Sequence, residues 1–181
     1  MIIFDTETSG LTRAVDTDIA KQPRIIEYFG LKVNDKTFEI EGELELLIYP
    51  GEAISQEITD ITKITNAMLQ GKPTFPQIFQ QLATFHLGES YIVGHNISFD
   101  VDMLTFELKR IGKLLNFPWP MVHICTVEAS EHLEGRRMKL ADLYKHLTGN
   151  TLVDAHRARN DVMATYECLK ELIAQGEFKL R

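Results

Sequence analysis

The sequence predicts one α/β domain in which a mixed β-sheet is covered by helices. Three strand-like segments come first, and helical and strand-like segments alternate after them. This order is typical of mixed sheets with helices on their faces. No internal repeat, low-complexity tract or linker interrupts the 181 residues, which are enough for one hydrophobic core. We therefore expect residues 1–181 to form a single domain.

Five segments have the apolar, β-branched and aromatic composition of strands. The predicted strands are Ile2–Asp5, Arg24–Val33, Phe38–Tyr49, Tyr91–Val93 and Met121–Cys125. The turn Asn34–Lys36 joins the second strand to the third. The polar segment Leu11–Pro23 is predicted to form a loop beside the end of the first strand.

Four further segments carry apolar residues every three or four positions, the spacing of one helix face. Pro76 suits a first helical turn, Ser98 can cap the second helix, and Gly112 and Gly149 can end the second and third. The apolar stripes are Phe75, Ile78, Phe79, Leu82 and Phe85; Val101, Leu104, Leu108 and Ile111; Leu140, Leu143, Tyr144 and Leu147; and Val162, Tyr166, Leu169 and Ile173.

Composition limits the class of protein further. A content of 44% hydrophobic and 25% charged residues is that of an ordinary globular protein. The segment Met1–Phe4 before the first acid is too short for a signal peptide. No run approaches the roughly 20 apolar residues of a membrane span, so we expect a cytoplasmic protein without membrane contact. Cys125 and Cys168 lack metal-ligand spacing and are predicted to be reduced core residues.

Two carboxylates, Asp5 and Glu7, lie one residue apart at the end of the first predicted strand. Because side chains alternate between the faces of a strand, both project from one face while Thr6 points away. Two acids on one face repel each other unless a positive group lies between them, and a divalent cation suits that place. The alternatives are a polar turn with solvated acids, or a phosphatase-type nucleophile at Asp5, which would require a second Asp where Glu7 stands.

Two further acids stand where helices are predicted to begin. Asp100 falls in the first turn of its helix, where the helix dipole favours a carboxylate. Asp161 follows His156 by five positions, an offset that does not stack two side chains on one helix face. We therefore expect His156 in the preceding loop and Asp161 in the second turn of the helix. Taken singly, Asp100 could be a helix-start acid and His156 a surface histidine.

These residues lie in segments that resemble the motifs of the DnaQ-like (DEDDh) 3′→5′ exonucleases. FDTETSGL, GHNISFD and HRARND match the three exonuclease motifs in order and spacing. The segments ITNAML and KPTF are similar to the family's connecting segment, and the resemblance extends from Ile3 to about Leu172. It implies a ribonuclease H-like fold, in which a mixed five-stranded sheet is flanked by helices.

The resemblance also implies roles for individual residues. The implied metal ligands are Asp5, Glu7, Asp100 and Asp161. His156 is the implied general base. Because the ordinary pKa of histidine is about 6.5, this side chain suits proton transfer near neutral pH. All-carboxylate ligation favours two Mg²⁺ or Mn²⁺ ions, which activate water and stabilise the departing 3′ oxygen. Thr6, Thr8 and Phe99 match positions that contact the terminal nucleotide.

The chain departs from the family pattern at three places. Ile25–Gly30 reads IIEYFG where IIEIG is usual, and Cys125–Thr126 replaces the common Asp-Thr. Thr62–Lys63 stands where a His-Gly pair usually lies beside the nucleotide. None of these positions is catalytic, and the last bears on nucleotide contact.

The implied activity is hydrolysis of single-stranded DNA or RNA 3′ ends to nucleoside 5′-monophosphates; the choice between DNA and RNA depends on pocket detail. The alternatives are an epsilon-like proofreading subunit docked on a DNA polymerase and an RNA-directed exoribonuclease. A non-catalytic nucleic-acid binder is disfavoured because no catalytic carboxylate is missing. Only Gln175–Arg181 follow the last predicted helix, so a self-contained enzyme is favoured.

The net charge of −7 argues against binding through a broad basic surface, although bound cations would reverse the field near the acids. Two basic clusters are predicted to be solvated helix faces, and guidance of a nucleic-acid strand is the alternative. They are Lys109, Arg110 and Lys113, and Arg136, Arg137 and Lys139. His95 is either a structural histidine at a strand end or a substrate contact.

Overall fold

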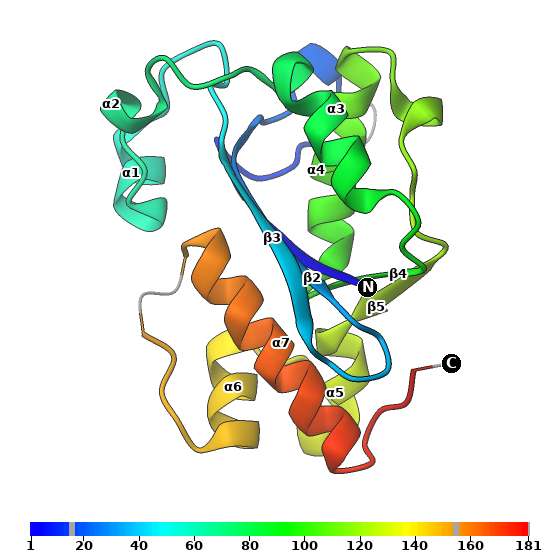
Figure 1. Ribbon diagram of the computed structural model, residues 1–181. Coiled ribbons are helices and arrows are strands. Elements are labelled where there is room, and N and C mark those ends of the chain that lie inside the picture. The colour runs from blue at the N-terminus through cyan, green and yellow to red at the C-terminus, as the bar shows by residue number, and fades with distance from the viewer. Residues whose placement is uncertain (15–16, 154–155, 181) are drawn as a thin grey trace.

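A five-stranded sheet forms the centre of the protein in the computed structural model, which describes residues 1–14, 17–153 and 156–180 (Figure 1). The strand order is β3-β2-β1-β4-β5. The strands are β1 Ile2–Thr8, β2 Ile25–Val33, β3 Ile40–Leu47, β4 Tyr91–Gly94 and β5 Val122–Cys125. Strand β2 pairs antiparallel with β1 and β3, whereas β4 is parallel to β1 and to β5. The predicted mixed five-stranded sheet is thus confirmed.

Seven α-helices are described around this sheet. They are α1 Gln56–Thr62, α2 Asn66–Leu69, α3 Phe75–His86, α4 Ile97–Arg110, α5 Thr126–Glu134, α6 Leu140–Thr148 and α7 Ala158–Ala174. The four helices expected from apolar spacing are confirmed as α3, α4, α6 and α7. None of the described helices is both long and apolar enough to cross a bilayer. Of the predicted loop Leu11–Pro23, residues 15 and 16 lie outside the described residues, and Ile19–Lys21 forms a 3₁₀ turn.

The alternation of side chains along β1 divides the core into two layers. Ile2 and Phe4 pack with α3 and α4 on one face of the sheet, and Ile3 packs with α7 on the other. Figure 1 shows these helices on opposite sides of the strands. Because Asp5 and Glu7 share the parity of Ile3, they belong to the face covered by α7.

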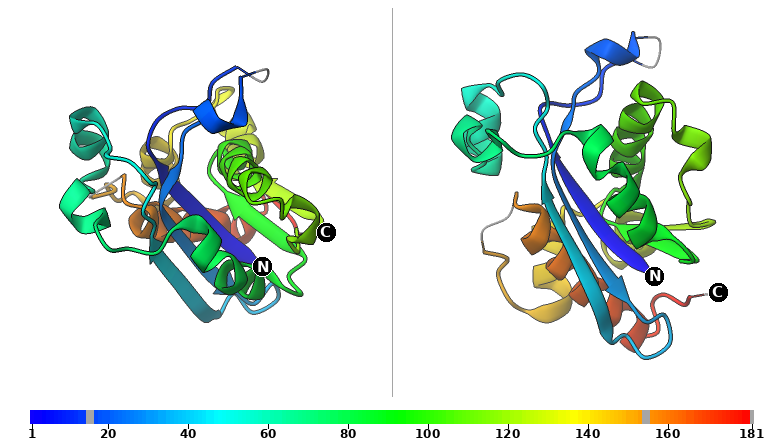
Figure 2. Two further views of the ribbon diagram at one scale, coloured as in Figure 1. Left: turned by 90° about the horizontal axis from the view of Figure 1, so that it is seen from above. Right: turned by 45° about the horizontal axis from the view of Figure 1, so that its top comes forward.

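Sequence periodicity missed three short helices. Helices α1 and α2 lie away from α4 in both views of Figure 2, and residues of this segment pack on Ile26 of β2. Helix α5 follows β5 without an intervening loop. Elements this short show too few turns for a 3.6-residue period to emerge. Lys63 ends α1 with a positive φ of 61°, a conformation that favours glycine, and this is the position where the family pattern has glycine.

The start of α4 differs from the prediction. Asn96, at φ 66°, is the residue before the helix, and the expected cap Ser98 lies inside the first turn. Asparagine tolerates the left-handed conformation that this sharp turn requires. A Cβ atom at Gly94 would lie 2.7 Å from Ile97 Cδ1 and 3.3 Å from the Phe4 carbonyl oxygen. The turn from β4 into α4 therefore depends on Gly94 and Asn96.

Candidate active site

Three carboxylates gather where β1 meets the start of α7. Asp5, Glu7 and Asp161 each offer an oxygen atom within 4.8 Å of the others. Asp5 and Glu7 come from one face of β1, as the alternation predicted. Asp161 lies in the first turn of α7, so the expected second-turn position is wrong. The helix begins at Ala158, which leaves His156 in the preceding loop as expected.

Asp100 reaches the same region from the opposite face of the sheet. Its Oδ1 accepts hydrogen bonds from the Thr6 backbone N–H at 2.9 Å and the Thr6 hydroxyl at 2.7 Å. Thr6 thus faces away from Asp5 and Glu7, as predicted, and its contact with Asp100 on the opposite face was not predicted. Asp100 is 3% exposed and lies in the first turn of α4, as predicted.

Burial and mutual repulsion raise the pKa of every acid in this group. Burial, followed by the negative charges of Asp100, Glu7 and Asp161, raises the pKa of Asp5 well above its ordinary value. Burial and then Asp161 raise the pKa of Glu7 to about 8. Burial likewise raises the pKa of Asp100 to about 7, against its hydrogen bonds from Thr6. Without a cation, burial and mutual repulsion thus favour the protonated forms of these carboxylates.

The donor set fits a divalent cation. Hard carboxylate oxygens are the ligands that Mg²⁺ and Mn²⁺ prefer. Within the described parts of the chain, Asp161 Oδ1 is buried and has no hydrogen-bond partner. A buried carboxylate oxygen without a partner is unfavourable unless a positive charge meets it. Asp5, Glu7 and Asp161 are therefore the residues best placed to hold a metal ion, and Asp100 stands beside them.

His156 adjoins the acids through its backbone. Its N–H donates to Asp161 Oδ2 at 3.1 Å, and its φ is 69°. A positive φ is uncommon for a residue with a side chain and marks a locally constrained backbone. The imidazole is exposed, and it lines a cavity together with Asp161. The histidine is thus accessible to solvent in the cavity that Asp161 also lines.

A buried ion pair that the sequence did not predict lies behind these residues. Glu27 is 1% exposed and lies opposite Glu7 across the β1–β2 ladder. Its carboxylate accepts from Arg157 Nη2 at 2.7 Å, Arg157 Nε at 3.3 Å and the Ala158 N–H at 3.1 Å. Glu27 therefore caps α7 from the sheet and fixes the residue that follows His156. A glutamate inside an apolar strand was the one available signal, because such a residue is rarely buried unless it is paired.

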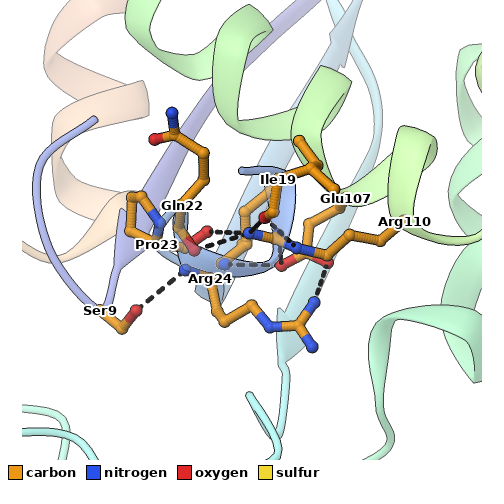
Figure 3. Close-up of polar contacts among 8 residues, drawn as sticks. Ser9, Ile19, Gln22, Pro23, Arg24, Glu107 and Arg110 are labelled. Atoms are coloured by element: carbon orange, nitrogen blue, oxygen red, sulfur yellow. Dashed lines mark hydrogen bonds and ion pairs between the residues drawn. The ribbon is translucent and has the colours of Figure 1, made fainter. Parts of the chain in front are cut away.

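A second ionic network anchors the loop that follows the motif FDTETSGL (Figure 3). The Arg110 guanidinium donates to the carbonyl oxygens of Ile19, Gln22 and Pro23 at 2.6–3.1 Å. Glu107, 2% exposed, pairs with Arg24 and Arg110, each at 3.0 Å. The expectation of a solvated basic cluster is therefore wrong for Arg110, whereas Lys109 and Lys113 are exposed as expected.

The predicted nucleotide contacts lie close to the acids. Thr8 is buried, and its hydroxyl donates to the Gly10 carbonyl at 2.7 Å. Phe99 is partly buried and packs against the core layer that contains Phe4. Thr62, where the family pattern has histidine, is 2% exposed and donates to the Ile58 carbonyl at 2.9 Å. The Thr62 side chain is therefore directed inward, whereas Lys63 is exposed.

His95 is a structural histidine. Its Nδ1 lies 2.9 Å from Thr126 Oγ1 and its Nε2 lies 3.1 Å from the Met138 carbonyl oxygen. Because a carbonyl only accepts, Nε2 carries the proton and Nδ1 accepts from Thr126. Burial lowers the pKa of His95 to about 4, so the ring is neutral. The sequence left two roles for His95, a structural histidine or a substrate contact, and these contacts support the structural role.

Comparison with known proteins gives consistent matches over nearly the whole chain. A family model described as Exonuclease, RNase_T, matches residues 2–169. DNA polymerase III PolC-type of Clostridium perfringens is 33% identical over 171 residues, 93% of this chain but 11% of that protein. DNA polymerase III subunit epsilon of Treponema pallidum is 31% identical over 175 residues, 94% of this chain and 75% of that protein. The chain thus spans about a tenth of the length of its PolC-type relatives.

Solved structures show the same fold. The nuclease domain of 3′hExo, described as a DEDDh family member bound to rAMP, superposes with a TM-score of 0.79 at 18% identity, covering 99% of this chain and 94% of that one. Exonuclease X in complex with 5′ overhanging duplex DNA gives a TM-score of 0.64 at 24% identity, covering 97% and 92%. The sheet order and flanking helices are therefore those of a known nuclease fold.

Proposed function

Because the chain belongs to the RNase_T exonuclease family and has the DnaQ-like, ribonuclease H-like fold, we propose that it is a metal-dependent 3′→5′ exonuclease. It acts on single-stranded nucleic-acid ends and releases nucleoside 5′-monophosphates, with residues 1–181 as one exonuclease domain. The observation that carries this proposal is the cluster of Asp5, Glu7 and Asp161, with the buried Asp161 Oδ1 left unpaired among the described residues.

The proposed reaction is attack of water on the terminal phosphodiester. The water oxygen bonds to phosphorus, the bond from phosphorus to the 3′ oxygen of the second nucleotide breaks, and that oxygen takes up a proton. His156 accepts the proton of the water, because the residue is exposed and lines the same cavity as Asp161. Asp5, Glu7, Asp100 and Asp161 hold two ions, Mg²⁺ or Mn²⁺, which supply stabilisation of the charge that develops on the phosphate.

The terminal nucleotide is proposed to lie against Thr6, Thr8 and Phe99. The hydroxyl protons of Thr6 and Thr8 are donated within the protein, so both hydroxyls offer only acceptor lone pairs to a ligand. The free 3′-hydroxyl of a terminal nucleotide is a donor that suits them. The ring of Phe99 offers an apolar face, and stacking of a base on such a face tolerates any sequence.

The test uses oligonucleotides labelled at the 5′ or the 3′ end, as DNA and as RNA, with Mg²⁺ or Mn²⁺ and with chelator. We expect a ladder that shortens from the 3′ end, release of 5′-monophosphates, and no reaction in chelator. Asp5→Asn should nearly abolish hydrolysis while the protein stays folded. Near-normal turnover by this variant, or shortening from the 5′ end, would overturn the proposal. The DNA and RNA arms settle which substrate is preferred.

A second candidate role, as the exonuclease of a DNA polymerase, is favoured by the relatives that are named PolC-type and subunit epsilon. In this role the chain would bind a polymerase and remove mismatched 3′ ends. Co-purification with a replicative polymerase from the source cell tests it. Binding should raise the rate of mismatch removal, whereas an exonuclease that works alone would gain nothing.

A further inference from the structure

A cavity of about 520 Å³ opens next to the catalytic group. It lies between the start of α4 and the segment that joins α5 to α6, and its lining includes both His156 and Asp161. Its apolar wall contains Val127, Met138, Leu140 and Leu152. Pockets that bind small molecules commonly enclose about 300–1,000 Å³ and combine apolar walls with a few polar groups. The size and composition therefore suit a nucleotide unit.

The charge of this cavity is opposite to that of the protein as a whole. Arg137 and Lys139 line it, and Asp161 is the one carboxylate in its described lining. Neither cation has an acidic partner among the ion pairs of the described residues, whereas the adjacent Arg136 pairs with Glu134 at 2.8 Å and Asp142 at 3.7 Å. In a chain with a net charge of −7, two unpaired cations beside the site favour an anion there.

The segment that carries these cations is anchored to the site. His95 Nε2 donates a hydrogen bond to the Met138 carbonyl oxygen at 3.1 Å, and Met138 itself is 2% exposed. Arg137 and Lys139 flank Met138 and are exposed. The segment lies between helices α5 and α6, so the expectation that Arg136–Lys139 is a helix face is wrong. The two cations are thus presented from a fixed backbone.

From these observations we propose that the cavity receives the second nucleotide from the 3′ end, with Arg137 and Lys139 contacting its 5′-phosphate. This inference rests on the proposed exonuclease function. Thr6, Thr8 and Phe99, assigned to the terminal nucleotide, are absent from the cavity lining. The leaving 3′ oxygen belongs to the second nucleotide, which must therefore extend from the acids in another direction. The cavity beside His156 and Asp161 provides that space, and its apolar wall faces the sugar and base.

Two dinucleotides isolate the proposed contact. The thymidine dinucleotides pTpT and TpT share the scissile bond and the terminal nucleotide, and only pTpT carries the 5′-phosphate on the second nucleotide. We expect the wild-type protein to cleave pTpT with a kcat/KM roughly tenfold higher, as for one charge-assisted contact. Arg137→Gln should remove most of this preference and leave cleavage of TpT unchanged. Arg136→Gln is the matched control and should keep the full preference.

The outcomes separate this inference from the function on which it rests. Failure of the wild-type protein to cleave either dinucleotide or longer strands would overturn both. Cleavage of both without preference for pTpT, or a preference that survives Arg137→Gln, would overturn only the second-nucleotide site. An equal loss on both dinucleotides in Arg137→Gln would also overturn it, because the side chain would then serve the catalytic group or the fold. Unfolding midpoints of the variants distinguish these last two causes.

Discussion

At the scale of single residues, repulsion among carboxylates dominates the energetics of the site. Glu7 illustrates it, since burial and Asp161 raise its pKa to about 8 in the metal-free protein. The folded state then keeps a proton on Glu7 that the unfolded chain loses near its ordinary pKa of 4.5. The contribution of protonated Glu7 to the stability of the fold is therefore fully present below pH 4.5. It is lost as the pH rises from 4.5 to about 8.

We expect Glu7→Gln to be more stable than the wild-type protein in chelator at pH 8, because the substitution removes a buried repulsive charge. The difference should shrink as pH falls and vanish below 4.5, where the glutamate is protonated in both states. Urea unfolding at several pH values measures it. With saturating Mg²⁺ the advantage should disappear, since the cation then compensates the charge. An advantage that grows toward low pH would contradict this account.

His156→Ala should slow hydrolysis by about 10²–10⁴-fold, the usual contribution of a general base. Metal binding should be largely retained, because Asp161 is contacted by the backbone N–H of residue 156 and alanine keeps that group. Titration with Mn²⁺ alongside single-turnover rates checks both parts. A loss of metal affinity as large as that of Asp161→Asn would identify His156 as a ligand instead.

At the scale of elements, two buried ion pairs join distant segments to the site. Glu27 on β2 fixes the start of α7 through Arg157 and Ala158. Arg110 on α4 fixes the loop between β1 and β2 (Figure 3). In both cases the glutamate, Glu27 or Glu107, is almost fully buried. Removal of the arginine therefore leaves a buried charge without a partner, and removal of Arg110 also leaves the loop carbonyls without a donor.

Arg157→Ala should destabilise the protein by roughly 2–4 kcal/mol, somewhat below the value for a fully buried pair because Arg157 is partly exposed. The lost ion pair and the added repulsion between Glu27 and Glu7 act in the same direction. Arg159→Ala is the matched control. Arg159 pairs with Glu43 and Glu45 at exposed positions, so its removal should change stability by about 1 kcal/mol or less. Urea unfolding in Mg²⁺ compares the two, and equal effects would refute the anchoring role of Glu27.

Arg110→Met should destabilise the protein by roughly 2–4 kcal/mol and loosen residues 9–24, because three loop carbonyls lose their shared donor. Lys109→Met, one position away and exposed, should have little effect on either property. Limited proteolysis and hydrogen exchange of the loop measure the loosening. Unchanged protection of the loop in Arg110→Met would show that other contacts hold it.

At the scale of the whole molecule, the acidic charge and the site at the sheet edge limit the substrate. A net charge of −7 argues against an extended basic surface for phosphate contacts, and Arg137 and Lys139 are cations that line the cavity. In the proposed reaction, a terminal nucleotide must also leave its stack to reach Asp5 and Glu7, which costs a few kcal/mol in a duplex.

Single-stranded ends should therefore be cleaved much faster than blunt duplex ends. The logarithm of the binding constant should fall with the logarithm of salt concentration by no more than about 2, the value for roughly three phosphates on a single strand. Competition between the two kinds of end and fluorescence anisotropy across a salt series measure these quantities. Equal cleavage of blunt ends, or a much steeper slope, would indicate an extended duplex-binding surface.

The local pattern of the sequence determined the strands, four helices and the five proposed catalytic positions. The two-residue period of β1 places Asp5 and Glu7 on one face, and the offset of five places His156 before α7. Each of these depends on neighbours within a few residues, which a sequence displays directly. Resemblance to the exonuclease motifs then supplied the roles.

Only the tertiary structure decided which distant groups meet. Hydrogen bonds join residues that are far apart in the sequence. Thr6 and Asp100 are separated by 94 positions, Arg157 and Glu27 by 130, and His95 and Met138 by 43. None of these pairs has a periodic or spacing signal, because the partners come from different elements and are brought together by the sheet order. The same reason hides the cavity to which Arg137 and Lys139 belong. The sequence thus determines which residues can do the chemistry, and the packing of layers on both faces of the sheet decides how they are held.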